Sequence, residues 1–419
     1  MQGAARFLKA ILQVIWKRRL IVLVLAALVA AAMSITGQFS ELNFADEREY
    51  FDIAQNLLRH GIYGLGPDHE PTAHRAPGYV LFITPLLGLG IGKYAIDLAQ
   101  IALWIFNAHL AARLALKLYG HLAASAALTF SLAYPIFLYA SLRLYPQILT
   151  ATLLLSTLYL LFCSERVKFF PLRAIAVGII VGASILVTPP IAMVLLSILV
   201  LTLVLRTLSL PAATTIAVTA SLTITPWLVR NWIVFDRPLL AATGGITLLQ
   251  GNSENSQPQI ADPDISRYRE AAKGLDAFES DRYYRNAAIE WMKDNPRLAL
   301  TLYVRKVFQF FNFQEKYATP GAGNWSIELL MFVSYYPILI LAILNFLLVR
   351  RWPLSRPETI LFLAYLGGAT SYAIFLVRLR YRIPFDYLLI ILASVALSKI
   401  IDFAIQDTVR GTTSTRANL

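Results

Sequence analysis

The stretch RLIVLVLAALVAAAMSITGQFSELNFADEREYFDIAQNLLRHGIYG, residues 19–64, decides the class of fold. Its first half contains an apolar run near 20–37, long enough as a helix to cross about 30 Å of hydrocarbon. Its second half repeats apolar residues at helical spacing, with Phe51, Ala54 and Leu58 on one face and charged or amide side chains on the other. A membrane helix followed by an amphipathic helix predicts a membrane protein with a helix lying along the membrane surface.

The whole chain is unusually apolar. Of its 419 residues, 57% are hydrophobic and only 15% are charged, a composition that excludes an ordinary soluble domain. The net charge of +12 is explained by basic residues that fix topology and meet anionic lipid, so nucleic acid is not an expected partner. The single cysteine, Cys163, excludes an internal disulfide and a cysteine-based metal site.

Further apolar stretches predict an all-α polytopic protein with about ten transmembrane helices. After 20–37 these stretches lie near 95–116, 122–141, 146–163, 171–188, 190–206, 210–228, 327–349, 358–376 and 383–401. The first stretch has the composition of a signal peptide, but the number of spans behind it favours an uncleaved anchor.

Two shorter stretches, 78–92 and 298–314, are ambiguous. If neither crosses the membrane, all the basic groups between spans fall on one side, which the positive-inside rule makes the cytoplasm. These groups are Lys17 to Arg19, Arg113 with Lys117, 166–173, Arg206 and 350–356. We therefore expect both stretches to be interfacial or re-entrant helices on the outer face. Both termini are then cytoplasmic, and the expected location is a bacterial inner membrane.

This topology divides the chain into three parts. Residues 1–228 form an N-terminal transmembrane module, whose first outer loop, 38–94, carries the acidic motif. Residues 229–326 form an extracytoplasmic loop long enough to order as a cap over a site. Residues 327–419 hold the last three membrane helices and a cytoplasmic tail.

The first outer loop places acidic and basic side chains at the same depth relative to the membrane surface. Asn43 is suited to capping the amphipathic helix, and Asp46 and Glu47 then lie in its first turn, where free N–H groups keep carboxylates ionised. Such acids can simply complement a helix terminus. Here, however, His74 and Arg75 follow at the start of HRAPGYVLFITPLL, just before another interfacial element.

Four stretches carry a resemblance to a known family. At ADEREYFDIAQNLLRHGIYG (45–64) and HRAPGYVLFITPLL (74–87) the chain resembles the GT-C superfamily, specifically glycosyltransferase family 39 and its relatives, the protein mannosyltransferases and lipid A aminoarabinose transferases. TPWLVRNWIVFDRPLLAATGGITLLQGNS (225–253) is similar to the end of the family's seventh span, and RLRYRIPFDYLLIILA (378–393) to the start of its last. The resemblance implies a GT-C fold and a polyprenyl-phosphate-linked sugar as donor.

The resemblance also implies roles for individual residues. Asp46 matches the family's catalytic aspartate, and Glu47 and Tyr50 match its neighbours, so Asp46 and Glu47 are the expected catalytic residues. Arg75 matches the basic residue before the proline, and Lys306 matches a lysine in a late amphipathic helix.

The chain also departs from the family pattern. Many relatives have an acidic residue where this chain reads RLYPQI (143–148), and Thr188, Pro189 and Pro190 replace a common Arg-Pro. These differences leave open the sugar and the acceptor, which can be a lipid, a glycan or a protein.

Transfer of a sugar from a lipid phosphate needs a base for the acceptor proton and a cationic group for the departing phosphate. Because phosphate leaves as an anion, no general acid is needed, and one carboxylate suffices. Inversion at the anomeric carbon should follow. Arginines at the outer mouth of the last span suit phosphate oxygens, although they can also anchor a helix at lipid headgroups. The expected phosphate-binding residues are Arg75, Lys306, Arg378, Arg380 and Arg382.

Other polar residues are weaker candidates. Tyr50, His74, Tyr381 and Asn252 are possible substrate-binding residues, although interfacial and turn positions explain them as well. No metal-binding cluster is visible in the sequence, and a monophosphate donor requires no cofactor, although Asp46 and Glu47 together could hold a divalent ion.

Two other functions remain open. A membrane transporter or lipid scramblase would have a similar number of spans, but it predicts ionisable groups near the middle of the bilayer. The spans here read as nearly free of charge. An oligosaccharide ligase with a lipid pyrophosphate donor is not separated from the monophosphate enzyme by the sequence.

Overall fold

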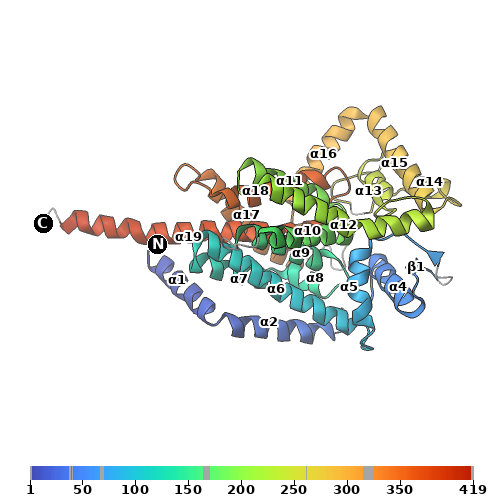
Figure 1. Cartoon of the computed structure of the whole chain (residues 1–419). Coiled ribbons are helices and arrows are strands. Elements are labelled where there is room, and N and C mark those ends of the chain that lie inside the picture. Colours follow the sequence, from blue (N-terminus) through green and yellow to red (C-terminus); the bar gives the residue numbers. More distant parts are fainter. Residues whose placement is uncertain are drawn as a thin grey trace.

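The computed structural model describes residues 2–36, 39, 41–66, 70–163, 170–260, 262–314 and 324–416, and these are almost entirely helical (Figure 1). The first ten described helices are α1 (Gln2–Lys17), α2 (Arg19–Ser34), α4 (Ala45–His60), α5 (Pro77–Leu87), α6 (Lys93–Tyr119), α7 (His121–Ala133), α8 (Pro135–Ser141), α9 (Gln147–Phe162), α10 (Phe170–Val187) and α11 (Ile191–Val204). The others are α12 (Leu210–Phe235), α13 (Gly244–Gly251), α14 (Ser266–Ala271), α15 (Ala277–Asp294), α16 (Pro296–Phe310), α17 (Trp325–Leu347), α18 (Arg356–Tyr372) and α19 (Leu379–Arg416). Strands β1 (Gly64–Leu65) and β2 (Glu70–Pro71) form a short antiparallel pair.

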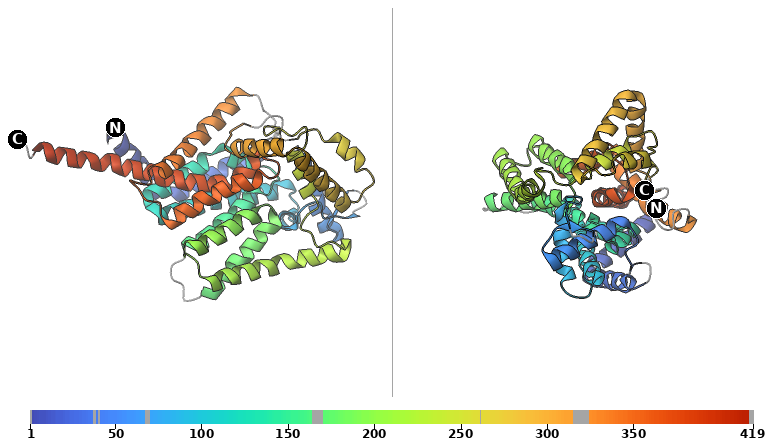
Figure 2. Two further views of the ribbon diagram at one scale, coloured as in Figure 1. Left: turned by 90° about the horizontal axis from the view of Figure 1, so that it is seen from above. Right: turned by 90° about the vertical axis from the view of Figure 1, so that its right-hand side faces the viewer.

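The helix bundle has two distinct ends. Helices α4 and α5 lie at one end together with α13 to α16, while α1 and the far end of α19 lie at the other (Figures 1 and 2). An ion pair of 2.8 Å between Lys9 and Asp402 joins α1 to α19. The segments that the sequence assigns to the outer face therefore gather at one end of the bundle, here called the outer end.

Within the described residues, four helices are long and apolar enough to cross a membrane: α6, α12, α17 and residues Leu379–Gln406 of α19. Helices α7 and α8 make a fifth candidate if the pair, bent by 58°, is one span. The apolar helices α2, α5, α9, α10 and α11 are shorter. The count of ten spans therefore stays a prediction. Residues 166–169 of the basic segment 166–173 fall outside the described part of the chain.

The two ambiguous stretches form the short helices α5 and α16. With 11 and 15 residues, they are about 17 and 23 Å long, less than the thickness of the hydrocarbon core. Tyr79, Val80 and Ile83 of α5 pack with Ile53 and Ala54 of α4. Helices α9 and α11, which the sequence predicts to cross, have only 16 and 14 residues, so the expectation that α5 and α16 do not cross stays a prediction.

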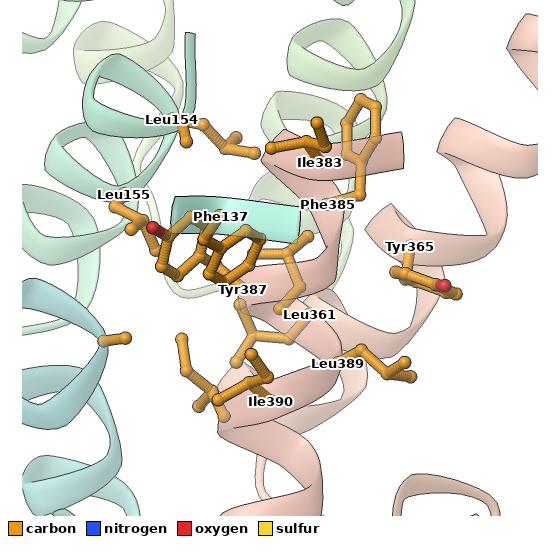
Figure 3. Close-up of a cluster of buried hydrophobic side chains, with 14 of the residues drawn as sticks. Phe137, Leu154, Leu155, Leu361, Tyr365, Ile383, Phe385, Tyr387, Leu389 and Ile390 are labelled. Atoms are coloured by element: carbon orange, nitrogen blue, oxygen red, sulfur yellow. The ribbon is translucent and has the colours of Figure 1, made fainter. Parts of the chain in front are cut away.

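The largest apolar core lies in the bundle around α19. The ring of Phe137 from α8 stacks on Tyr387 of α19, with 3.9 Å between centroids and 12° between planes. Leu154 and Leu155 of α9 and Leu361 of α18 lie in the same cluster (Figure 3). This packing fixes α19 against the rest of the bundle, and with it the arginines at its outer end.

The expectation that the spans are nearly free of charge is wrong. In the part of the chain that the structure describes, three ion pairs are buried in the predicted spans or at their ends: Lys93 with Asp97, Arg382 with Asp386, and Lys399 with Glu358. Average hydropathy hides these charges because a few ionic residues are outweighed by their apolar neighbours. Each charge has its counter-ion within reach, so the cost of removing it from water is offset locally.

Two glycines allow α10 and α12 to pack closely. A Cβ atom at Gly178 would lie 2.6 Å from the Cβ of Thr219 and 2.8 Å from the carbonyl oxygen of Ile216, and Gly182 meets Thr223 in the same way. Small residues four apart are typical of tightly packed membrane helices, whose backbones come close enough for extensive van der Waals contact.

We predict that Gly178→Ala destabilises the protein by about 1–3 kcal/mol, the usual cost of overpacking, because α10 and α12 must separate. Thermal unfolding in detergent measures the change. Gly367→Ala in α18 is the matched control, since its Cβ would meet only Ser197 Oγ at 3.9 Å. Equal unfolding temperatures for the two variants would show that this contact does not limit stability.

Candidate active site

The first turn of α4 is fixed by Glu47. Its Oε2 accepts the backbone N–H groups of Asn43 (3.0 Å) and Phe44 (3.1 Å), and its Oε1 accepts that of Leu144 (3.0 Å). The prediction that Asn43 caps the helix is wrong, because the residue at the cap position is Phe44 and Glu47 satisfies the N–H groups from inside the helix. Glu47 is completely buried, and its catalytic role stays a prediction.

The chain after α4 turns back toward the first turn of that helix. Gly61, in the left-handed conformation at φ 69°, ends the helix, and the pair β1–β2 reverses the chain. Tyr63 accepts the N–H of Thr72 at 2.9 Å and donates its hydroxyl to the carbonyl of Arg75 at 3.0 Å. These bonds lay residues 72–76 against α4.

A cluster of opposite charges results. Arg75 Nη2 lies 2.5 Å from Asp46 Oδ1, and Arg380 Nη2 lies 2.5 Å from Asp46 Oδ2. Arg75 also donates through Nε to Glu49 Oε2 at 2.8 Å. The structure thus brings together Asp46, Arg75 and Arg380 from α4, the following loop and α19. All three were predicted site residues.

Asp46 is held ionised. Burial alone raises the pKa of its carboxyl group, but the attraction of Arg380 and Arg75 outweighs burial and holds the pKa well below its usual value. The carboxylate therefore stays charged until the pH falls far below the ordinary range for aspartate. The side chain retains 25% of its exposure, so it remains open to a ligand.

Glu49 is a site residue that the sequence analysis missed. It lies three residues after Asp46, on the same face of α4, and it accepts from Arg75 and lies 3.3 Å from His74 Nε2. Burial raises the pKa of the Glu49 carboxyl group. The hydrogen bonds and positive charges of His74 and Arg75 lower this pKa by more than burial raises it, so the net shift is downward. The i, i+3 spacing from Asp46 was the signal that could have identified it.

Aromatic rings line the cationic groups. The Arg75 guanidinium lies over Tyr50 at 5.1 Å from the ring centroid, and Arg380 lies over Tyr145 at 4.9 Å and Tyr381 at 5.4 Å. Such contacts orient a guanidinium group and add to its stabilisation. Tyr50 and Tyr381 thus lie beside the cluster, and their role in substrate binding stays a prediction.

Arg382 lies away from the cluster. Its Nη1 donates to the carbonyls of Phe310 (2.8 Å) and Asn312 (2.6 Å), its Nε pairs with Asp386 at 3.0 Å, and its guanidinium covers the ring of Tyr335 at 3.7 Å. With 1% exposure, it has no face left for a phosphate. The predicted phosphate role does not fit this arrangement, in which Arg382 joins α19 to the end of α16.

The contacts of Lys306 and Asn252 also differ from those expected of a phosphate-binding and a substrate-binding residue. Lys306 Nζ donates to the carbonyls of Gly251 and Phe375 and to Asn252 Oδ1, at 2.9–3.1 Å. A Cβ at Gly251 would come within 2.3 Å of the Phe375 oxygen, so α13 lies directly against the end of α18. Burial lowers the pKa of Lys306 to about 7. Both residues fasten the cap to the bundle, and neither faces the charge cluster.

Arg378 lies beside Gln309 and Phe310 in a narrow crevice, and its phosphate role stays a prediction. Among the described residues, no three His, Cys, Asp or Glu side chains are grouped so as to hold a metal ion. The expectation that no metal is required is not tested by this finding.

Fold and site together define a helical membrane protein with a charged site at one end of its bundle. The fold is similar to that of ArnT from Cupriavidus metallidurans, in a crystal structure bound to undecaprenyl phosphate, with a TM-score of 0.56, 16% identity and 90% of this chain covered. The apo structure of that ArnT aligns over 91% of this chain with a TM-score of 0.49 and 14% identity. This chain covers 59% of the ArnT chain in both cases.

No family model and no curated protein sequence matches this chain. The likeness to ArnT therefore shows a shared fold at low sequence identity. Undecaprenyl phosphate is the ligand of the ArnT crystal structure.

Arg380 and Arg382 of α19 should differ in how much they contribute to the stability of the fold. Arg382→Ala leaves Asp386 buried without its counter-ion, and we expect a loss of about 3–5 kcal/mol. Arg380→Ala should cost much less, since its pair with Asp46 is partly open to solvent. Unfolding temperatures in detergent test this difference. The double variant Arg382→Met, Asp386→Leu should recover the part of the loss that comes from the unpaired carboxylate, and a double variant no more stable than Arg382→Ala would refute the ion-pair explanation.

Proposed function

We propose that this protein is a glycosyltransferase of the bacterial inner membrane. It moves a sugar from a polyprenyl-phosphate donor to an acceptor at the extracytoplasmic face, with inversion and with Asp46 as the base. Both termini are then cytoplasmic, and the outer end of the bundle faces away from the cytoplasm. The convergence of Asp46, Arg75 and Arg380 carries this proposal. The ArnT-like fold supports it, since the ArnT crystal structure holds undecaprenyl phosphate.

The cluster contains the groups that the reaction needs. The acceptor hydroxyl gives its proton to the Asp46 carboxylate while its oxygen attacks the anomeric carbon, and the bond between that carbon and the phosphate oxygen breaks. The bonding electrons leave with the phosphate, which gains one negative charge. Arg75 and Arg380 stabilise this charge, because fixed cationic groups in a partly desolvated site favour a developing anion.

The shared cations couple the base to the phosphate. In the free site both guanidinium groups neutralise Asp46 and depress its pKa, which makes it a weak base. A donor phosphate that binds Arg75 and Arg380 draws their charge away from Asp46, so its pKa rises and proton uptake becomes easier. During transfer one negative charge disappears from Asp46 and one appears on the phosphate, beside the same two cations.

Glu47 and Glu49 then support Asp46 in different ways. Glu47 is a positioning residue, since all its observed partners are backbone N–H groups and the Arg143 guanidinium at 3.9 Å. Glu49 holds Arg75 through Nε, which leaves that guanidinium oriented toward Asp46. The buried ion pairs of the bundle are each satisfied internally, so they do not favour a transporter.

We expect Asp46→Asn to lower the transfer rate by about 10²- to 10⁴-fold, the usual loss for a positioned base, with donor affinity equal to or above that of the wild type, since Asn no longer competes for Arg75 and Arg380. The assay follows sugar transfer from a polyprenyl-phosphate sugar to an envelope extract in nanodiscs. Asp52→Asn is the matched control, because Asp52 is exposed on another face of α4. A folded Asp46→Asn protein with wild-type turnover would remove Asp46 from the mechanism.

We expect Arg380→Ala to weaken binding of the donor by about tenfold or more, as for loss of a charged hydrogen bond. Arg380→Lys should recover only part of this loss, because an ammonium group cannot replace a planar fork. Binding of polyprenyl phosphate to protein in nanodiscs measures the effect, with Arg237→Ala, an exposed arginine of the outer loop, as control. Equal affinities for wild type and Arg380→Ala would contradict the phosphate assignment.

A further inference from the structure

A second hollow lies between α6 and α9, far from the charge cluster. Its volume is about 350 Å³, within the range of small-molecule pockets. Its lining comes from one stripe of each helix: Phe106, His109, Leu110 and Arg113 from α6, and Ser156, Tyr159 and Leu160 from α9. The pocket is therefore mostly apolar, with imidazole, guanidinium and hydroxyl groups among the apolar side chains.

Positive charge gathers around this pocket. Arg113 and Arg19 of α2 both act electrostatically on His109, and Arg113, Lys117 and Arg173 act on Cys163 at the end of α9. Among the described residues, Arg113 forms no ion pair with a carboxylate. Cationic groups from three helices thus lie near His109 or Cys163, and the lining of the pocket holds Arg113 and no carboxylate.

The depth of the pocket follows from the geometry of α6. Lys93, at the other end of this helix, donates to the carbonyl of Leu142, in the turn that binds Glu47 through Leu144. Twenty residues separate Lys93 from Arg113, which corresponds to about 30 Å along a helix and to the thickness of the hydrocarbon core. The pocket therefore lies at the membrane face opposite the candidate active site.

We infer that this pocket binds an anionic phospholipid of the adjacent leaflet. Arg113 and His109 contact its phosphate, and an acyl chain lies along Phe106, Leu110 and Leu160. Basic pockets between membrane helices on this side of a bilayer suit anionic headgroups. The positive-inside rule explains why a basic residue such as Arg113 lies near this face of the membrane. It does not require that residue to line a hollow between two helices, as Arg113 does. This lipid site is independent of the proposed transferase activity.

The test uses binding of dioctanoyl phosphatidylglycerol to the full-length protein in a neutral detergent, measured by the rise in unfolding temperature. Dioctanoyl phosphatidylcholine and inorganic phosphate are the comparison probes. We expect phosphatidylglycerol to stabilise the wild type more than either of them. Arg113→Gln should weaken its binding about tenfold, since a charged contact is lost.

Arg350→Gln is the matched control, because it removes one charge from an exposed residue in a predicted cytoplasmic loop. Leu160→Trp keeps every charge and fills the apolar part, and it should weaken binding as well, which tests the pocket if Arg113→Gln fails to fold. The inference is overturned if Arg113→Gln binds like the wild type, or if Arg350→Gln weakens binding equally. It is also overturned if phosphatidylcholine or inorganic phosphate stabilises as strongly as phosphatidylglycerol.

Discussion

The buried carboxylate of Glu47 determines how the outer end of the protein is arranged. It joins the start of α4 to Leu144, 97 residues further along the chain. A buried carboxylate is costly unless hydrogen bonds replace water, and here three backbone N–H groups do so. Because successive helical residues are about 100° apart, fixing Glu47 also fixes the direction of Asp46. The neighbouring turn residue, Tyr145, lies against Arg380, so one turn positions both partners of the central ion pair.

The sequence identified the central residues of the site but could not separate equivalent-looking ones. Arg380 and Arg382 lie two residues apart in a single motif, and residues at this spacing do not share a helix face. Once α19 forms, Arg380 points to Asp46 while Arg382 enters the bundle and pairs with Asp386. The motif alone contains no information about which face meets α4. Lys306 was misjudged for a similar reason, since its carbonyl partners come from distant segments.

The fold was predictable at the level of helices and less so at the level of spans. Apolar runs located the helices correctly, because burial in lipid or protein requires the same composition. For that reason they could not say which helices cross a membrane, and the 58° bend between α7 and α8 is not encoded in average hydropathy. The close contact at Gly178 was equally invisible, because it depends on where Thr219 lies in a partner helix.

Helix α13 links α15 to the segment before α19 by two close backbone contacts. At one end Gly245 touches α15 so closely that a Cβ would come within 1.9 Å of the Asp281 carbonyl oxygen, and at the other a Cβ at Gly251 would come within 2.3 Å of the Phe375 carbonyl oxygen. Neither contact leaves room for an added side-chain atom, so only glycine fits at both positions. Phe375 lies five residues before Arg380, and these two glycines therefore help to set where α15 lies relative to the cation that the proposed chemistry uses.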